Sequence, residues 1–230
     1  MSAETLTGSE SLARAIRTPR AAALAGIAFS LLFGIALVLV RAAVPADPNE
    51  AEKWISDESR RDSVLVALGL VPFAGIAFLW FIGVLRDRVG EAEDRFFATA
   101  FLGSGLLFVG MIFVASAVAA GLIVASEHNL DKLLSSGAWD FGRKTTQELM
   151  VVYAMRMAAV FMLAATTILR RSRLAPGWLV ASGYLGAVVL LLTVGLFAWI
   201  ELVFPAWVLI LSTYVLIASF RGGTEGVRPT

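Results

Sequence analysis

The 230-residue chain contains no cysteine and a single histidine, His128. The missing cysteines exclude disulfides, thiol redox chemistry and thiolate metal sites, and a lone histidine excludes bis-histidine haem ligation. The sequence also has no phosphate-binding loop, nucleophile elbow or paired metal-binding histidines. We therefore expect no resident metal or cofactor and assign no residue to a catalytic site.

Charged residues are scarce as well. They make up 16% of the chain and hydrophobic residues 58%, whereas about 25% of the residues in a soluble domain are charged. The net charge of +1 argues against a nucleic-acid partner, because such proteins are strongly basic. The charges lie in short clusters separated by apolar runs long enough to cross a bilayer. This pattern predicts an all-α, polytopic membrane protein surrounded by membrane lipids.

The apolar runs predict a bundle of six transmembrane helices. The last apolar block, residues 176–220, would be about 68 Å long as one helix, so we expect the chain to turn back near Glu201. Short surface helices are expected in the two long connections, residues 41–63 and 127–148. The expected spans are 21–40, 64–85, 96–126, 146–169, 176–200 and 202–220, with tails at 1–20 and 221–230.

Six spans place both termini on one side of the membrane. The segments on that side contain eleven Lys and Arg residues, and the opposite segments contain seven. The positive-inside rule therefore favours cytoplasmic termini. Eleven of the 18 acidic residues fall on the opposite side, so we expect a weakly acidic outer face.

Two spans are joined by a ten-residue loop, residues 86–95, that holds three arginines and four acids. The surrounding stretch, residues 78–108, reads FLWFIGVLRDRVGEAEDRFFATAFLGSGLLF. It resembles a run found in uncharacterised small polytopic membrane proteins of high-GC Gram-positive (actinobacterial) bacteria. The resemblance implies a multi-pass protein of the bacterial inner membrane and assigns no activity or site residue.

The fourth expected span carries one charge, Arg156, within an otherwise uncharged run at residues 149–169. A charge at that depth costs at least about 2.5 kcal/mol on insertion scales, so it normally has a partner or a function. A structural arginine would snorkel to the outer edge of the membrane or pair with an acid there. Glu201 is the first candidate partner and Glu148 the second, and Tyr153 shares the same helical face. Alternatively, Arg156 binds an anionic ligand, lines a pathway, or belongs to a site completed by another subunit.

The first expected span has small residues at every fourth position: Ala22, Gly26, Ser30 and Gly34. This spacing places them on one face, where another helix can approach closely. The face predicts tight helix packing, either within the chain or against a partner.

Three classes of function fit these features. The first is a non-catalytic interaction or assembly module that forms a homo-oligomer or binds another membrane protein. The second is a small transporter or channel in which Arg156 meets an anionic cargo. The third, a membrane enzyme acting on lipid or envelope precursors, is disfavoured because the only close groups of acids lie in loops.

The predicted orientation can be tested by introducing cysteines, since the native chain has none. Cysteines at Ala92 and Ala175 should be protected from an impermeant thiol reagent in intact cells, because both positions are expected on the cytoplasmic side. A cysteine at Ser136 should be labelled. Labelling at Ala92 without labelling at Ser136 would reverse the topology.

Overall fold

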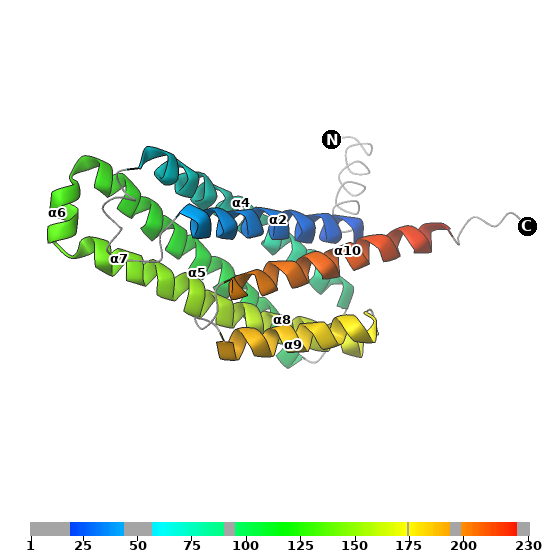
Figure 1. The fold of residues 1–230 in the computed structure, drawn as a ribbon. Coiled ribbons are helices and arrows are strands. Elements are labelled where there is room, and N and C mark those ends of the chain that lie inside the picture. The colour runs from blue at the N-terminus through cyan, green and yellow to red at the C-terminus, as the bar shows by residue number, and fades with distance from the viewer. Residues whose placement is uncertain (1–18, 44–56, 90–94, 174, 194–198, 225–230) are drawn as a thin grey trace, which may run out of the picture.

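The computed structural model describes residues 19–43, 57–89, 95–173, 175–193 and 199–224. These residues form helices, and no strand occurs among them. The long helices lie side by side, and the short α6 turns across one end of the bundle (Figure 1). The surface helix expected in the first long connection, at about residues 48–55, lies outside the described residues.

The segment η2 is π-helical, and η3 is a short 3₁₀ turn. In chain order the elements are α2 (Pro19–Ala43), α4 (Glu58–Val89), α5 (Arg95–His128), α6 (Leu130–Ser135), α7 (Ala138–Gln147), η2 (Glu148–Ala154), α8 (Met155–Arg171), α9 (Gly177–Thr193), η3 (Ile200–Leu202) and α10 (Val203–Thr224).

Within the described residues, five helical stretches are long and apolar enough to cross a membrane. This confirms the expected class, an all-helical multi-pass membrane protein. The stretches are Arg20–Ala42, Glu58–Arg86, Phe96–His128, Ala138–Arg171 and Ile200–Phe220. The helix α9 is also apolar, but its 17 described residues fall short of the length that defines the other five.

The fourth stretch begins earlier than the sequence suggested. Thr145 and Glu148 have the spacing of a helix-capping pair, which predicts a helix start near residue 146. In the structure, α7 begins at Ala138 after Gly137, whose φ is +73°, and runs through η2 into α8. Trp139 and Gly142 are buried on α7, and an added Cβ at Gly142 would meet the Leu122 side chain of α5. Packing against α5 thus favours the longer helix over the local capping signal.

Phenylalanine side chains fill the centre of the bundle. Phe78 of α4 is fully buried, and its ring centroid lies 4.5 Å from that of Phe29 and 5.0 Å from that of Phe161. It also lies 5.3 Å from the ring of Phe108 and 5.6 Å from that of Phe204. These five rings come from five helices, α2, α4, α5, α8 and α10. The separations and tilted or edge-on geometries are those that aromatic pairs prefer.

The small-residue face of α2 lies inside this bundle. Ala22, Gly26 and Ser30 are buried, and the Ser30 hydroxyl donates to the Gly26 carbonyl at 2.8 Å. A Cβ added at Gly26 would overlap the Ser212 hydroxyl of α10 and approach the Phe81 ring of α4 to 2.9 Å. At Gly26 the face therefore packs against α4 and α10 within the chain.

Gly34 belongs to the same face but behaves differently. It is only partly buried, and a Cβ added there would meet no atom within 4 Å outside its own helix. The close approach that the four-residue spacing predicted is thus observed at Gly26 and does not extend to Gly34.

This difference generates a stability prediction. Gly26→Leu should destabilise the protein by about 1–3 kcal/mol, because overpacking forces α4 and α10 away from α2. The thermal midpoint in detergent should fall by several degrees. Gly34→Leu is the matched control and should stay within about 2 °C of the parent. Equal midpoints for the two variants would show that α2 does not pack as described.

Candidate functional site

Arg156 is the second residue of α8, directly after the π-helical segment η2. Its side chain is exposed on the wall of the bundle and does not enter the phenylalanine core. Its Nη1 donates a hydrogen bond to the backbone carbonyl of Val152 at 3.4 Å. Since this distance is long for a hydrogen bond and a guanidinium has five donors, most of its binding capacity is available to another group.

The π-helical turn supplies that carbonyl. The Val152 oxygen also accepts from the backbone N–H of Met155, so two donors meet it at the junction of η2 and α8. A π-helical turn is rare, and such turns occur frequently at functional sites because they alter the positions of carbonyls and side chains. The turn therefore places an irregular backbone segment beside Arg156, the one charge within residues 149–169.

Tyr153, one of the expected neighbours, lies three residues before Arg156 in η2. Its side chain is 54% exposed, and that of Arg156 is exposed as well. Glu148 is exposed at the start of η2, two turns before Arg156.

Glu201, the first candidate partner, occupies a different setting. It lies in η3 at the start of α10, with only 8% of its surface exposed. Within the described part of the chain, no ion pair joins Arg156 to Glu201 or to Glu148. The structure thus joins Arg156 to the Val152 carbonyl, leaves Arg156 and Tyr153 exposed, and forms no ion pair between Arg156 and the expected acids among the described residues.

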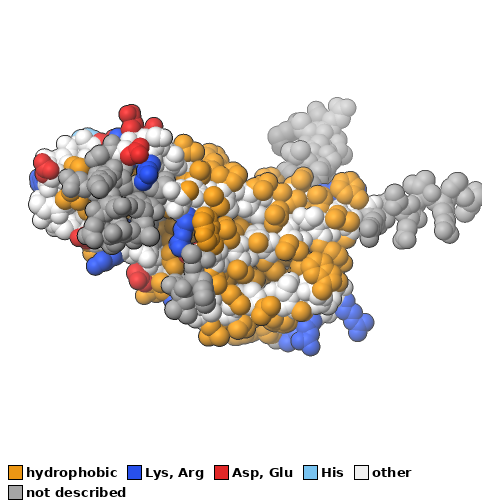
Figure 2. Space-filling model, viewed as in Figure 1, with side chains coloured by type: hydrophobic (Ala, Val, Ile, Leu, Met, Phe, Trp, Pro, Cys, Tyr) orange, Lys and Arg blue, Asp and Glu red, His pale blue; other side chains and the backbone are white. Residues whose placement is uncertain are grey.

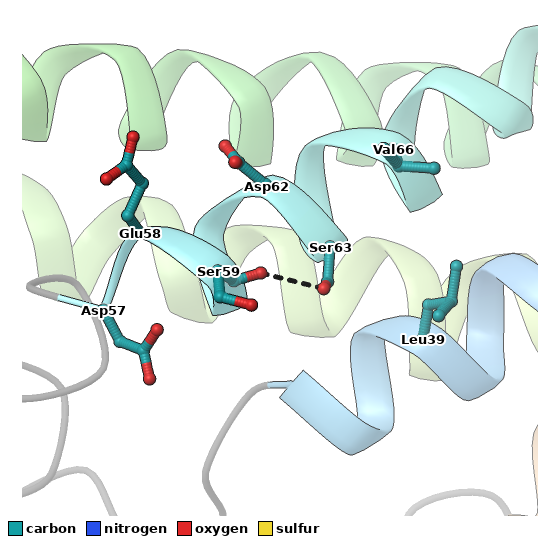
Figure 3. Close-up of a pocket in the computed structure, with 7 residues that line it drawn as sticks. All are labelled: Leu39, Asp57, Glu58, Ser59, Asp62, Ser63 and Val66. Atoms are coloured by element: carbon teal, nitrogen blue, oxygen red, sulfur yellow. Dashed lines mark hydrogen bonds between the residues drawn. The ribbon is translucent and has the colours of Figure 1, made fainter.

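A second group of polar residues lies at the start of α4. Asp57 Oδ1 accepts from the backbone N–H of Arg60 at 3.3 Å, and its Oδ2 pairs with the Arg60 Nε at 3.3 Å. Asp57 therefore acts as the helix cap. Figure 3 shows the Asp57 carboxylate pointing away from those of Glu58 and Asp62, so the three do not converge on one ion. No group of three metal-ligating side chains occurs among the residues described.

His128 has a structural contact at the end of α5. Its Nδ1 lies 3.0 Å from the carbonyl oxygen of Val124, so this nitrogen carries the proton and donates to the helix backbone.

Two further polar groups were not singled out from the sequence. Thr166 of α8 and Trp207 of α10 are buried, and neither the Thr166 hydroxyl nor the Trp207 ring N–H has a hydrogen-bond partner among the described residues. Both atoms lie against Gly183 of α9, where an added Cβ would overlap the threonine hydroxyl and lie 3.0 Å from the indole nitrogen. Gly183 thus lets three helices meet, which no local sequence pattern indicated.

Comparison of the chain with protein-family models, curated proteins and solved structures finds no match. The functional argument therefore depends on the geometry of this chain.

The separation of Arg156 from Glu201 can be tested with a double-mutant cycle on thermal stability. Arg156→Leu, Glu201→Leu and the double variant should give additive effects, with an interaction energy below about 0.5 kcal/mol. Additivity is expected because the two side chains are not in contact. If one partner of a desolvated pair were removed, the loss would typically be 3–5 kcal/mol, and the double variant would recover much of it. Such recovery would show that the residues pair in the membrane.

Proposed function

We propose that the protein is a non-catalytic membrane interaction module that binds another membrane protein through the outward face carrying Tyr153 and Arg156. It crosses a bacterial inner membrane six times, with α9 in the crossing beyond the five long stretches. Both termini lie in the cytoplasm.

The distribution of charge supports this orientation. Acidic side chains gather toward the α6 end of the molecule, where α4 begins and α5 ends (Figure 2). At the opposite end, where α2 begins and α4 and α8 end, every charged side chain whose surroundings are described is an arginine. These are Arg20, Arg86, Arg170, Arg171 and Arg173. The positive-inside rule assigns this basic end to the cytoplasm.

The sealed phenylalanine core supports an interaction module over a transporter. Phe29, Phe78, Phe108, Phe161 and Phe204 each have 0% exposure, and their rings occupy the space where the five long helices meet. A permeation pathway needs polar or water-accessible lining, whereas these rings leave an apolar, closely packed centre.

The outward position of Arg156 is the observation that carries the proposal. An arginine facing hydrocarbon is unfavourable by about 2.5–3.5 kcal/mol or more, so an anionic group at the same depth would stabilise it. No acid of the described residues supplies that group. A carboxylate on the transmembrane helix of a partner protein has the required charge and geometry, since guanidinium and carboxylate pair in two parallel hydrogen bonds.

The alternative is an anion transporter that uses Arg156. The exposed guanidinium beside a π-helical turn favours it, because both features occur where ligands bind within membranes. The closed core opposes it, since an anion held at Arg156 would have no passage between the helices.

The two functions predict different results in purified proteoliposomes. An interaction module should show anion flux equal to that of protein-free liposomes. Flux above that level, abolished by Arg156→Leu, would establish the transporter instead.

Partner binding is tested with a photo-crosslinking residue placed at Tyr153 in native membranes. A discrete cross-linked protein species should form, and Arg156→Leu should abolish it because the anionic group loses its counter-charge. Leu185, which is 67% exposed on α9, is the matched control position and should not give that species. A second copy of the chain in the cross-link would identify a homo-oligomer. Lipid adducts alone, equal at both positions, would contradict the proposal.

A further inference from the structure

A cavity of about 230 Å³ lies between α2, α4, α8 and α10 near the basic end of the molecule. Eight of its eleven lining residues are apolar, among them Ala22, Phe81, Leu169 and Val215. The cavity is partly enclosed and reaches the surface beside α10, where Ala218 is exposed. This part of α10 diverges from α9 as it approaches the C-terminal end (Figure 1).

The volume and the lining decide what fills the cavity. It is smaller than the roughly 300–1,000 Å³ of most small-molecule sites, so it accepts part of a chain better than a whole compact ligand. Water needs several polar partners, and only Ser212, Tyr214 and Ser219 of the lining carry hydroxyl groups, so water would leave most of the wall without polar contacts. An empty space would forfeit dispersion contacts along its lining. A hydrocarbon chain entering from the surrounding bilayer satisfies all three constraints.

Arginines follow or precede the lining residues on three of the four helices. Arg20 lies one turn before Ala23 on α2, Arg86 follows Leu85 on α4, and Arg170 follows Leu169 on α8. All three arginine side chains are exposed. The Arg20 guanidinium carbon also lies 4.6 Å from the centroid of the Phe220 ring, which holds it at the junction of α2 and α10. Three of the four helices that wall the apolar cavity therefore carry an exposed arginine within one turn of a lining residue, which is the positive charge that an anionic headgroup with an attached chain needs.

We infer that this cavity is a binding site for an anionic phospholipid of the cytoplasmic leaflet. One acyl chain fills the space between α2, α4, α8 and α10, and the phosphate lies among Arg20, Arg86 and Arg170. The surrounding lipids solvate a hydrocarbon chain about as well as the cavity does, so burying the chain adds little affinity. The fit of the chain to the cavity therefore sets where the lipid binds, and the arginines set the preference for an anionic headgroup. This site is separate from the outward face of Arg156 and does not depend on the function proposed for that face.

Native mass spectrometry of the full chain in mild detergent tests this inference. The protein should retain one phosphatidylglycerol in preference to a phosphatidylcholine with the same acyl chains. The double variant Arg20→Gln/Arg170→Gln should weaken phosphatidylglycerol retention by roughly 5-fold for each arginine removed. Lys132→Gln, at the opposite end of the molecule, is the charge control and should bind as the parent does. Glycerol 3-phosphate, which has the phosphate without the chains, should not compete.

Filling the cavity gives a second readout. Ala218→Trp should reduce lipid retention because the indole occupies the opening, while Ala181→Trp, an exposed position on α9, should not. Unchanged thermal midpoints will show that all variants fold. Equal retention of the two phospholipids by the parent and the double arginine variant would overturn headgroup recognition. Parent-like binding by Ala218→Trp would overturn the assignment of the chain to the cavity, and displacement by glycerol 3-phosphate would identify a phosphate site instead.

Discussion

The close packing of phenylalanine rings at the centre of the bundle is the constraint on which the rest of the structure depends. Within a bilayer, burying an apolar side chain gains little over lipid contact, so helix association rests on van der Waals packing and polar contacts. Phe78 touches rings from four other helices and thereby ties α4 to α2, α5, α8 and α10. The glycines at close approaches, such as Gly26 and Gly183, let the backbones come near enough for this contact.

A dry centre determines where polar groups can lie. Buried serines such as Ser30 and Ser116 donate to carbonyls of their own helices, and Arg156 projects outward beside η2. Most described charged residues lie toward the two ends, with acids and basic residues together toward α6 and arginines at the other end (Figure 2). Binding chemistry is thus expected on the outer wall and at the ends of the bundle, which is where the Arg156 face and the α2–α4–α8–α10 cavity are found.

The sequence predicted the class of fold because apolar length is a local property of each run. It located the charge at Arg156 but not its direction, since the rotation of α8 depends on its contacts with α5 and α9. For the same reason Gly26 and Gly34 look equivalent in the sequence, while only Gly26 faces side chains of α4 and α10. The capping pattern at Thr145 and Glu148 was overridden by packing of α7 against α5. The cavity could not be predicted, because its walls come from four helices far apart in the chain.

The most direct test of the central claim compares two phenylalanines on the same helix. Phe78 has 0% exposure and Phe73 is 64% exposed, and both lie on α4. Phe78→Ala should destabilise the protein by about 2 kcal/mol, because removing the ring leaves an empty space at the centre of the bundle that the surrounding rings fill only partly. Its thermal midpoint in detergent should fall by several degrees, whereas Phe73→Ala should leave the midpoint nearly unchanged. Equal effects of the two substitutions would contradict a bundle held together by its phenylalanine core.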